Sequence, residues 1–414
     1  MRTLQEFLRD HRWDAAAARD RLQRDAAGLL PTLPADDLGT VGVIDETGVR
    51  KQGDKTPGVA RQYLGCAGKV ENGIVTVHLG VCRGAFKALI DADLYLPRAW
   101  DEDRPRCRAA GIPDDLAYRP KWQIALGQID RARGNGVTLD WLTFDAEYGK
   151  RPGFVAGLRE RGPRFVGEVP RALSCLAVSR AGRRPDGSVK ARPAEEVVRV
   201  SAAFRSRPWR VLRLARETLG EQVWRFKAAR VWLHDAGGWS GESYWLVWAS
   251  DDRTGEEKFF LADAPAGTGE EVLVRVGFRR AGVEHAIRVA KSELGFAHFE
   301  GRSYVALMRH LSLCLAASNF AAAHAERLRG EKSAGDGGAG LPGAGVAERA
   351  LAGAAARDGR AGVRAAGDRL PPGAKPGGAG IQAEAPRRGA VPEEPEAPKK
   401  KTAQPVYGKL KVAL

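Results

Sequence analysis

Three acidic residues, far apart in the sequence, are of a type and placement that could act on a phosphate. Asp45 ends the apolar run VGVID, Asp145 ends LDWLTFD, and Glu284 lies in the helical stretch GVEHAIRVAKSELGF. An acid at the end of a buried strand exposes its side chain while the backbone stays rigid. Taken singly, each acid also has a plainer interpretation: a turn cap for the aspartates and a solvated ion-pair ladder for the glutamate.

Together, the three carboxylates could hold divalent cations. Cleavage of a DNA strand by water, and joining by a free 3′-hydroxyl, are displacements at phosphorus in which charge builds on the attacking and leaving oxygens. Two Mg²⁺ ions roughly 3.5 to 4 Å apart can bind both oxygens, and such ions prefer hard oxygen ligands over histidine or cysteine. The metal would also relieve the repulsion between clustered acids.

Basic residues near these acids could contact a nucleic-acid backbone, because Lys and Arg neutralise phosphates. Three of them belong to the stretch around Glu284, where residues four and seven positions apart share a helix face. Three others follow the aspartates in the sequence. The candidate DNA-binding residues are Arg280, Lys291, Arg288, Lys51, Arg61 and Lys150. For the last four, the alternative is a basic side chain that is simply solvated.

Other polar neighbours are expected to be structural. Glu46 is one position from Asp45, and side chains one position apart on an extended chain point to opposite faces. Glu147, two positions after Asp145, is likewise expected to be structural. His285 is one position from Glu284 and so about 100° around the helix. Six of the ten tryptophans fall between Trp209 and Trp248, where they could stack on bases or simply form the core of a β-rich region.

The composition favours a nucleic-acid partner. Lys and Arg number 66 against 51 Asp and Glu, a net charge of +15, which suits a polyanion. The five cysteines include no C-x-x-C pair, so neither a zinc knuckle nor a disulfide framework is expected. The charged N-terminus lacks a signal sequence, and no uninterrupted apolar run of about 18 residues occurs. We therefore expect a cytoplasmic, nucleoid-associated protein without a membrane segment.

The sequence around the acids predicts strands and helices that form a mixed α/β sheet. VGVID, GVARQYLGCAG and GIVTVHLGVC are expected strands, with the Asn-Gly of KVENG as a hairpin turn between the last two. A helix over PKWQIALGQIDRARGNG, the strand LDWLTFD, the helix FVAGLRERG and the strand RFVGEV follow. The order β-β-β-α-β-α-β favours a mixed sheet flanked by helices.

Composition changes along the chain divide it into five expected segments. A region with alternating apolar and polar residues predicts β strands inserted between the sheet and the helix that carries Glu284. From residue 331 the chain holds 16 of its 50 glycines and a single aromatic residue, which favours a disordered tail or the product of a shifted reading frame. The segments are an N-terminal helical part at 1–38, a first core part at 39–170, a β-rich insertion at 171–275, a helical core part at 276–330 and the tail at 331–414.

These features together resemble the DDE transposases of bacterial insertion sequences, in the DDE-superfamily endonuclease group, which have an RNase H-like fold interrupted by a β-rich insertion. The resemblance is carried by VIDETGVRKQGDKTPGVARQYLGCAGKVENG, LDWLTFDAEYGKRPGF and GVEHAIRVAKSELGF. Asp45, Asp145 and Glu284 match the family's three acids. Arg280 and Lys291 match the basic residues of its signature, whereas Gly277 stands where the signature has a tyrosine.

The resemblance implies an enzyme that cuts the ends of its own element and joins them to target DNA. It implies two Mg²⁺ ions, with Mn²⁺ as a substitute, held by the three acids. The partners implied are the element's terminal inverted repeats, target DNA and a second copy of the chain in a synaptic homodimer.

Two alternatives stay open at this stage. Family members generally have more helical sequence before LQEFLRD and a basic, helical ending, so the chain could be a truncated, inactive copy that binds DNA without transposing. A different RNase H-like nuclease, such as a junction resolvase, is disfavoured by the large insertion before Glu284.

Overall fold

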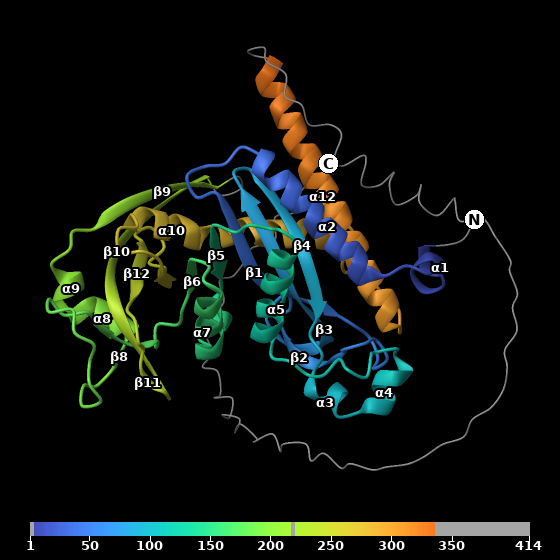
Figure 1. The fold of residues 1–414 in the computed structure, drawn as a ribbon, viewed down its shortest axis with the longest axis horizontal. Coiled ribbons are helices and arrows are strands. Elements are labelled where there is room, and N and C mark those ends of the chain that lie inside the picture. Colours follow the sequence, from blue (N-terminus) through green and yellow to red (C-terminus); the bar gives the residue numbers. More distant parts are fainter. Residues whose placement is uncertain (1–3, 217–219, 336–414) are drawn as a thin grey trace, which may run out of the picture. The chain divides into compact units, whose positions relative to one another are not determined.

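The first strands form the sheet on which the site is built. The computed structural model describes residues 4–216 and 220–335. The strands of this part are β1 (Thr40–Arg50), β2 (Ala60–Leu64), β3 (Lys69–Arg83), β4 (Phe86–Leu94), β5 (Trp141–Phe144) and β6 (Phe165–Glu168). They lie in the order β4-β3-β1-β5-β6 (Figure 1), with β3 antiparallel to its neighbours β1 and β4, and with β5 parallel to β1 and β6. This is the expected RNase H-like α/β sheet.

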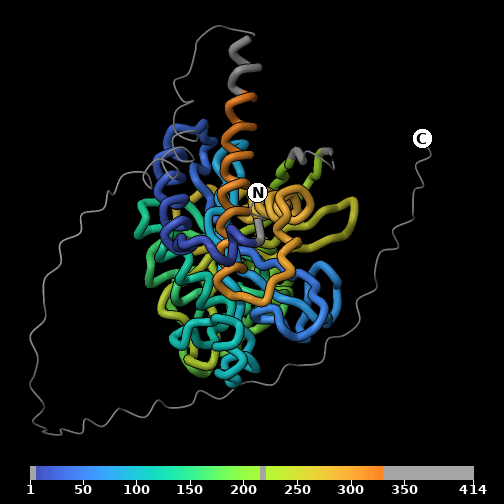
Figure 2. The backbone as a smooth tube through the Cα atoms, turned by 90° about the vertical axis from the view of Figure 1, so that its right-hand side faces the viewer, coloured from blue at the N-terminus to red at the C-terminus, as the bar shows by residue number. Residues whose placement is uncertain are grey.

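Helices cover both faces of this sheet because β1 is apolar on both sides. Val41 and Val43 face a core beneath α11 and α12, whereas Ile44 faces a second core beneath α5 and α7. Figure 2 shows α12 beside α2, which also contacts β4. The helices of this part are α1 (Leu4–Arg9), α2 (Ala15–Leu29), the 3₁₀ turn η1 (Leu30–Thr32), α3 (Arg98–Asp101), α4 (Arg104–Ala109), α5 (Lys121–Gly134), α6 (Ala146–Gly149), α7 (Pro152–Arg161), α11 (Arg280–Ser292) and α12 (Tyr304–Gly335).

The segment expected as a β-rich insertion extends the same sheet. Strand β13 pairs antiparallel with β6, and β12, β10 and β9 follow in turn. The sheet therefore runs without interruption from the strands that carry the aspartates into the later strands. The elements are β7 (Ser174–Ala177), β8 (Arg192–Pro193), α8 (Ala194–Val200), α9 (Ala202–Arg205), β9 (Arg210–Arg216), β10 (Gly220–Asp235), β11 (Gly238–Trp239), β12 (Tyr244–Asp251), β13 (Glu257–Asp263) and α10 (Glu270–Phe278).

The expected Asn-Gly hairpin turn is wrong, because Asn72 and Gly73 lie inside β3. The turn between β2 and β3 lies at 65–68 instead, where Gly68 takes a positive φ of 65°. The Asn72 side-chain amide donates to the carbonyls of Lys51 and Gly53, both at 2.8 Å. A Cβ at Gly73 would lie 2.4 Å from the Val49 carbonyl oxygen. Asn72 and Gly73 therefore allow β3 to lie close to β1 at this point.

Two further strand expectations need correction. Strand β1 continues five residues past Asp45 to Arg50, so Asp45 lies within the strand, opposite His78. Strand β4, whose sequence FKALIDADL carries two acids, was not among the expected strands. These acids, Asp91 and Asp93, are compensated inside the protein, so charge does not prevent the strand from being buried.

A buried ion-pair network compensates the acids of β4. Arg131 of α5 pairs with Asp91 at 2.8 Å and also with Asp93, while Arg19 of α2 lies 3.1 Å from Asp93. Gln23 donates to Asp91 at 2.8 Å. Buried charges are tolerated only when they are paired and hydrogen-bonded, and this network meets that condition. It joins α2 and α5 to one strand.

The C-terminal helix α12 runs from Tyr304 to Gly335, five residues beyond the segment boundary expected at 330. Its window Tyr304–Arg329 is long and apolar enough to cross a membrane by length and composition alone, and 44% of that window is buried. The helix packs on β4, α2 and α1. The expected absence of a membrane segment stays a prediction. The expected disordered tail falls, from residue 336 on, outside the described residues.

Candidate active site

Strand register brings the two aspartates to the same level of the sheet. In the parallel pair β1–β5, Ile44 lies beside Phe144. Asp45 follows Ile44 within β1, and Asp145 follows Phe144 directly after the end of β5. Asp45 is 8% exposed and accepts a hydrogen bond from the Glu46 amide at 2.8 Å. Asp145 caps α6 and accepts from the Glu147 amide at 3.0 Å. The pairing of β1 with β5 thus places the two aspartates at one level of the sheet.

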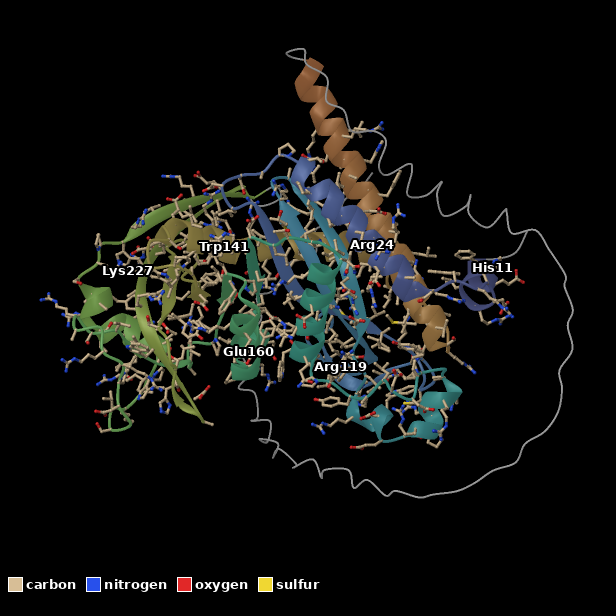
Figure 3. The ribbon with its side chains drawn as sticks, viewed as in Figure 1. His11, Arg24, Arg119, Trp141, Glu160 and Lys227 are labelled. Atoms are coloured by element: carbon tan, nitrogen blue, oxygen red, sulfur yellow. The ribbon has the colours of Figure 1, made fainter. Side chains whose placement is uncertain are left out.

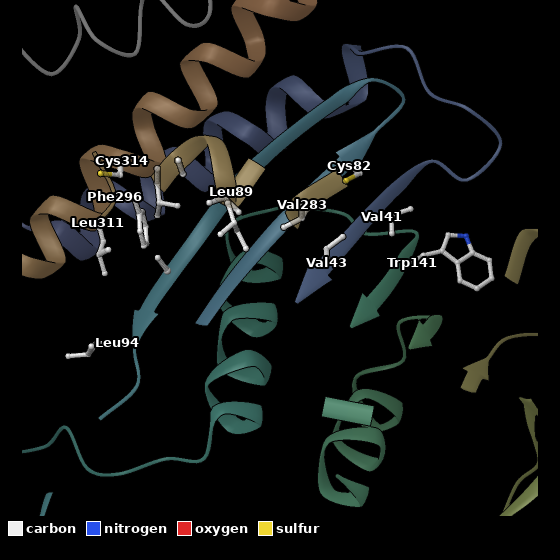
Figure 4. Packing of buried hydrophobic residues seen from close by; sticks show 14 of the residues in the cluster. Val41, Val43, Cys82, Leu89, Leu94, Trp141, Val283, Phe296, Leu311 and Cys314 are labelled. Atoms are coloured by element: carbon white, nitrogen blue, oxygen red, sulfur yellow. The ribbon is translucent and has the colours of Figure 1, made fainter. Parts of the chain in front are cut away.

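Helix α11 brings Glu284 over this edge. Its apolar residues Val283, Ala286, Ile287 and Ala290 are buried, and Figure 4 shows Val283 close to Val41 and Val43 of β1. Gly80 of β3 makes room for this packing, because a Cβ there would lie 2.7 Å from the Val283 side chain. Glu284 follows Val283 in the helix, so the packing of Val283 on the sheet holds its backbone in place. Its side chain is 46% exposed.

The Arg280 guanidinium lies among the three acids. One of its nitrogens, Nη1, is 2.6 Å from Glu284 Oε1 and 3.8 Å from Asp45 Oδ2. Burial by itself would lower the pKa of Arg280, but the charges of Glu284, Asp45 and Asp145 together raise it. A single cation thus connects the two strands with α11.

The carboxylates resist ionisation in this setting. Burial raises the pKa of Asp45 to about 7, against the opposing effect of Arg280, and the charges of Asp145 and Glu284 raise it further. Burial also raises the pKa of Asp145. Like charges and a low dielectric both disfavour the ionised form. The site is therefore short of positive charge.

The acids have the donor chemistry that Mg²⁺ prefers, but they do not yet converge as ligands. Among residues 4–216 and 220–335, no group of three or more His, Cys, Asp or Glu side chains is close enough to hold a metal ion. The Arg280 guanidinium stands between Asp45 and Glu284, and it is a cation held by the same oxygens that would ligate a metal. The residues fit a divalent cation in charge and donor type, provided that Arg280 moves.

The basic residues of the same helix differ in what they contact. The Lys291 ammonium donates to the Gly48 carbonyl at 3.0 Å, so it ties the end of α11 to β1. Burial lowers the pKa of Lys291. Arg288 is exposed on the same face as Glu284 and donates to His285 at 2.9 Å.

The three other basic candidates differ in how far their side chains are buried. The Lys51 ammonium is 1% exposed and bonds to the Phe299 carbonyl and to Glu300, 3.0 Å away. That side chain holds β1 to the segment before α12 and presents no charge to DNA. Arg61 on β2 and Lys150 after α6 are exposed, and Lys150 pairs with Glu147 at 2.7 Å.

Glu46 lies where its position in the strand predicted. It pairs with Lys121 of α5 at 2.7 Å, on the opposite face of β1 from Asp45. Gly277, at the place of the signature tyrosine, is buried against Phe260, whose ring would be 2.8 Å from a Cβ. A tyrosine at this position would have no room in this fold.

A fourth acid was missed by the sequence reasoning. Glu168 ends β6, and the β5–β6 register pairs Leu142 with Phe165, so Glu168 lies level with Asp145. It lines, together with Arg280 and Glu284, a cavity of about 150 Å³. The signal was present in RFVGEV, since an acid follows a buried strand there as it does for the two aspartates.

Comparison with known proteins identifies the family of the chain. The DDE superfamily endonuclease family matches residues 1–234, a range that contains both aspartates and ends before Glu284. A probable transposase for insertion sequence element IS701 from Microchaete diplosiphon is 32% identical over 167 residues, which are 39% of this chain and 39% of that protein.

Among solved structures, the NurA nuclease from Sulfolobus solfataricus aligns with 79% of this chain and 95% of its own, at 10% identity and a TM-score of 0.28. The family match covers more than half of the chain. From its sequence, the chain belongs to the DDE superfamily endonuclease family.

Proposed function

We propose that this protein is a DNA transposase of a bacterial insertion sequence, which cleaves the ends of its element and transfers the strands to target DNA. Membership of the DDE superfamily endonucleases and the similarity to a probable transposase support this proposal. The observation that carries it is the meeting of Asp45, Asp145 and Glu284 around a single guanidinium. These acids come from three separate elements, and all three carry charge that acts on Arg280.

In this proposal, Asp45, Asp145 and Glu284 hold two Mg²⁺ ions, for which Mn²⁺ can substitute. When bound, the ions stabilise the charge on the attacking and leaving oxygens of the phosphate. The paired strands β1 and β5 keep the two aspartates fixed, which orients the site without reorganisation during the reaction. Glu284, half exposed on α11, completes the ligand set from the side open to DNA.

The DNA backbone would lie along the exposed face of α11. Arg288 shares that face with Glu284, and Arg61 and Lys150 offer further exposed positive charge. Basic side chains occur elsewhere too, such as the labelled Arg24 and Arg119 in Figure 3. The element's terminal repeats and target DNA are the proposed partners, with a homodimer as the synaptic form in the bacterial cytoplasm.

The test is an in vitro assay on a plasmid that carries the element's terminal repeats. Asp45→Asn, Asp145→Asn and Glu284→Gln should each reduce strand nicking by about a thousandfold, while DNA binding in a gel-shift assay stays within about twofold. Glu147→Gln is the matched control, because Glu147 lies two positions after Asp145 yet is 58% exposed and paired with Lys150. It should cleave like the wild type.

Each outcome decides a separate point. Cleavage retained in any one of the three variants rejects the role of that acid. A wild-type protein that binds the terminal repeats but never nicks them, with Mg²⁺ or with Mn²⁺, rejects the enzyme in favour of an inactive DNA-binding copy.

A further inference from the structure

Glu168 occupies a place equivalent to that of the aspartates, on the next strand of the sheet. Strands β1, β5 and β6 are neighbours and parallel. Asp45, Asp145 and Glu168 each stand one or a few residues beyond the last paired position, at the carboxyl ends of the pairings. Glu168 is therefore a fourth acid at one edge of the sheet, outside the set of three that the family signature matches.

Glu168 and Arg280 share the wall of one cavity. The cavity, of about 150 Å³, lies between the later strands and helices α10 and α11. Arg280 and Glu284 line it from α11, and Glu168, Glu256 and Lys258 line it from the strands and the turn before β13. The charge of Glu168 is also among those that raise the pKa of Arg280. Arg280 and Glu168 thus line one cavity and interact electrostatically.

Arg280 cannot keep its present place once the three acids hold divalent cations. Its Nη1 is 2.6 Å from Glu284 and 3.8 Å from Asp45, so it would lie against ions of the same sign at contact distance. Repulsion at that range in a partly buried site is large. A displaced, still partly buried guanidinium needs a new carboxylate partner, since an unpaired buried charge is costly.

Glu168 can become that partner without leaving another charge unpaired. At present Lys258 holds Glu168 at 3.2 Å and Glu256 at 3.3 Å. If Glu168 turns to Arg280, Lys258 keeps Glu256. Lys258 therefore keeps a carboxylate partner when Glu168 changes its partner to Arg280.

We propose that Glu168 is a positioning residue that receives the Arg280 guanidinium when divalent cations occupy Asp45, Asp145 and Glu284. This rests on the proposed metal-dependent function. Arg280 then serves as counter-charge of the acids in the cation-free protein and, once paired with Glu168, holds its remaining donors beside the site, where a DNA phosphate can accept them.

The test measures Mn²⁺ binding alone, without DNA, by isothermal titration calorimetry on the full chain. Glu168→Gln should weaken Mn²⁺ binding by about fivefold, because the displaced guanidinium lacks its acceptor. Glu256→Gln is the comparison, since it removes from the same cavity the carboxylate that keeps Lys258 when Glu168 turns away. Because Glu168 itself remains as the acceptor of Arg280, this variant should weaken binding by less than Glu168→Gln, by about twofold at most. Glu168→Asp, which keeps the charge, should bind more tightly than Glu168→Gln.

The decisive comparison uses Arg280→Gln as background. If Glu168 acts through Arg280, adding Glu168→Gln to Arg280→Gln should change Mn²⁺ affinity by less than about twofold. A purely electrostatic or structural effect of Glu168 would persist in that background, and this persistence would overturn the inference. Equal effects of Glu168→Gln and Glu256→Gln would overturn it as well.

Failure of the proposed function gives a different pattern. In that case the wild type does not bind Mn²⁺, or Asp45→Asn binds it as well as the wild type does. Binding that Asp45→Asn abolishes but Glu168→Gln leaves unchanged overturns only the role of Glu168.

Discussion

Replacing Asp45 by Asn should make the cation-free protein more stable. Asp45 is 8% exposed, and its folded-state pKa of about 7 lies well above the ordinary value of 3.8. Each unit of difference corresponds to about 1.4 kcal/mol, so ionised Asp45 costs about 4 kcal/mol of folding free energy at pH 8. Asparagine keeps the shape and can still accept the hydrogen bond from the Glu46 amide, but it carries no charge.

The sign of the pH dependence follows from the raised pKa. Below about pH 3 the carboxyl is protonated in both the folded and the unfolded protein, so charge gives the variant no advantage. As the pH rises toward 7, the unfolded chain ionises while the folded protein retains the proton, and the wild type loses stability. The advantage of Asp45→Asn should therefore grow by roughly 2 to 3 kcal/mol between pH 5 and pH 8.

The assay is thermal and urea unfolding in a buffer with a metal chelator. At pH 8 the midpoint temperature of Asp45→Asn should exceed that of the wild type by roughly 5 to 10 °C. Asp140→Asn is the control, because Asp140 has a structural role, accepting a hydrogen bond from the Thr40 amide at 2.7 Å; it should not stabilise. A loss of stability in Asp45→Asn, or a gain that is independent of pH, would show that Asp45 is an ordinary structural acid.

Three further predictions concern the scaffold. Arg131→Met should cost about 3 to 5 kcal/mol in urea unfolding, because it breaks a buried network, whereas Arg161→Met, at a more exposed pair, should cost less than about 1 kcal/mol. Gly167→Ala should cost about 3 kcal/mol in the same measurement, since a Cβ would lie 1.9 Å from the Phe144 ring. Tyr148→Phe should change the free energy of unfolding by less than about 0.5 kcal/mol, because the buried hydroxyl has no hydrogen-bond partner within residues 4–216 and 220–335; a larger loss would mean that it is bonded.

Local patterns succeeded where one element determines the outcome by itself. The strand that ends before Asp145, the helix that carries Glu284 and the strands of the insertion follow their apolar periodicity in the structure. The opposite facing of Asp45 and Glu46 likewise follows from the two-residue repeat of a strand. These features depend on neighbours within a few residues, so the sequence alone predicts them.

The wrong predictions concern residues whose contacts are made with partners far away in the sequence. Asn72 reads as a turn residue, but carbonyls 19 and 21 residues away accept its amide. Strand β4 was not among the expected strands, and Arg19 and Arg131 reach its two acids from two helices. Lys51 reads as a candidate for DNA binding, but its ammonium is held inside by a segment 248 residues later. No local pattern contains these partners.

The sequence by itself determined the kind of chemistry: three carboxylates, basic neighbours on one helix face and a chain rich in positive charge. Tertiary structure alone decided that the register of β1 with β5 sets two aspartates level, that Arg280 stands among the acids, and that Glu168 joins them from β6. The reason is that residue type fixes what a group can bind, whereas pairing between strands far apart in the chain fixes which groups meet.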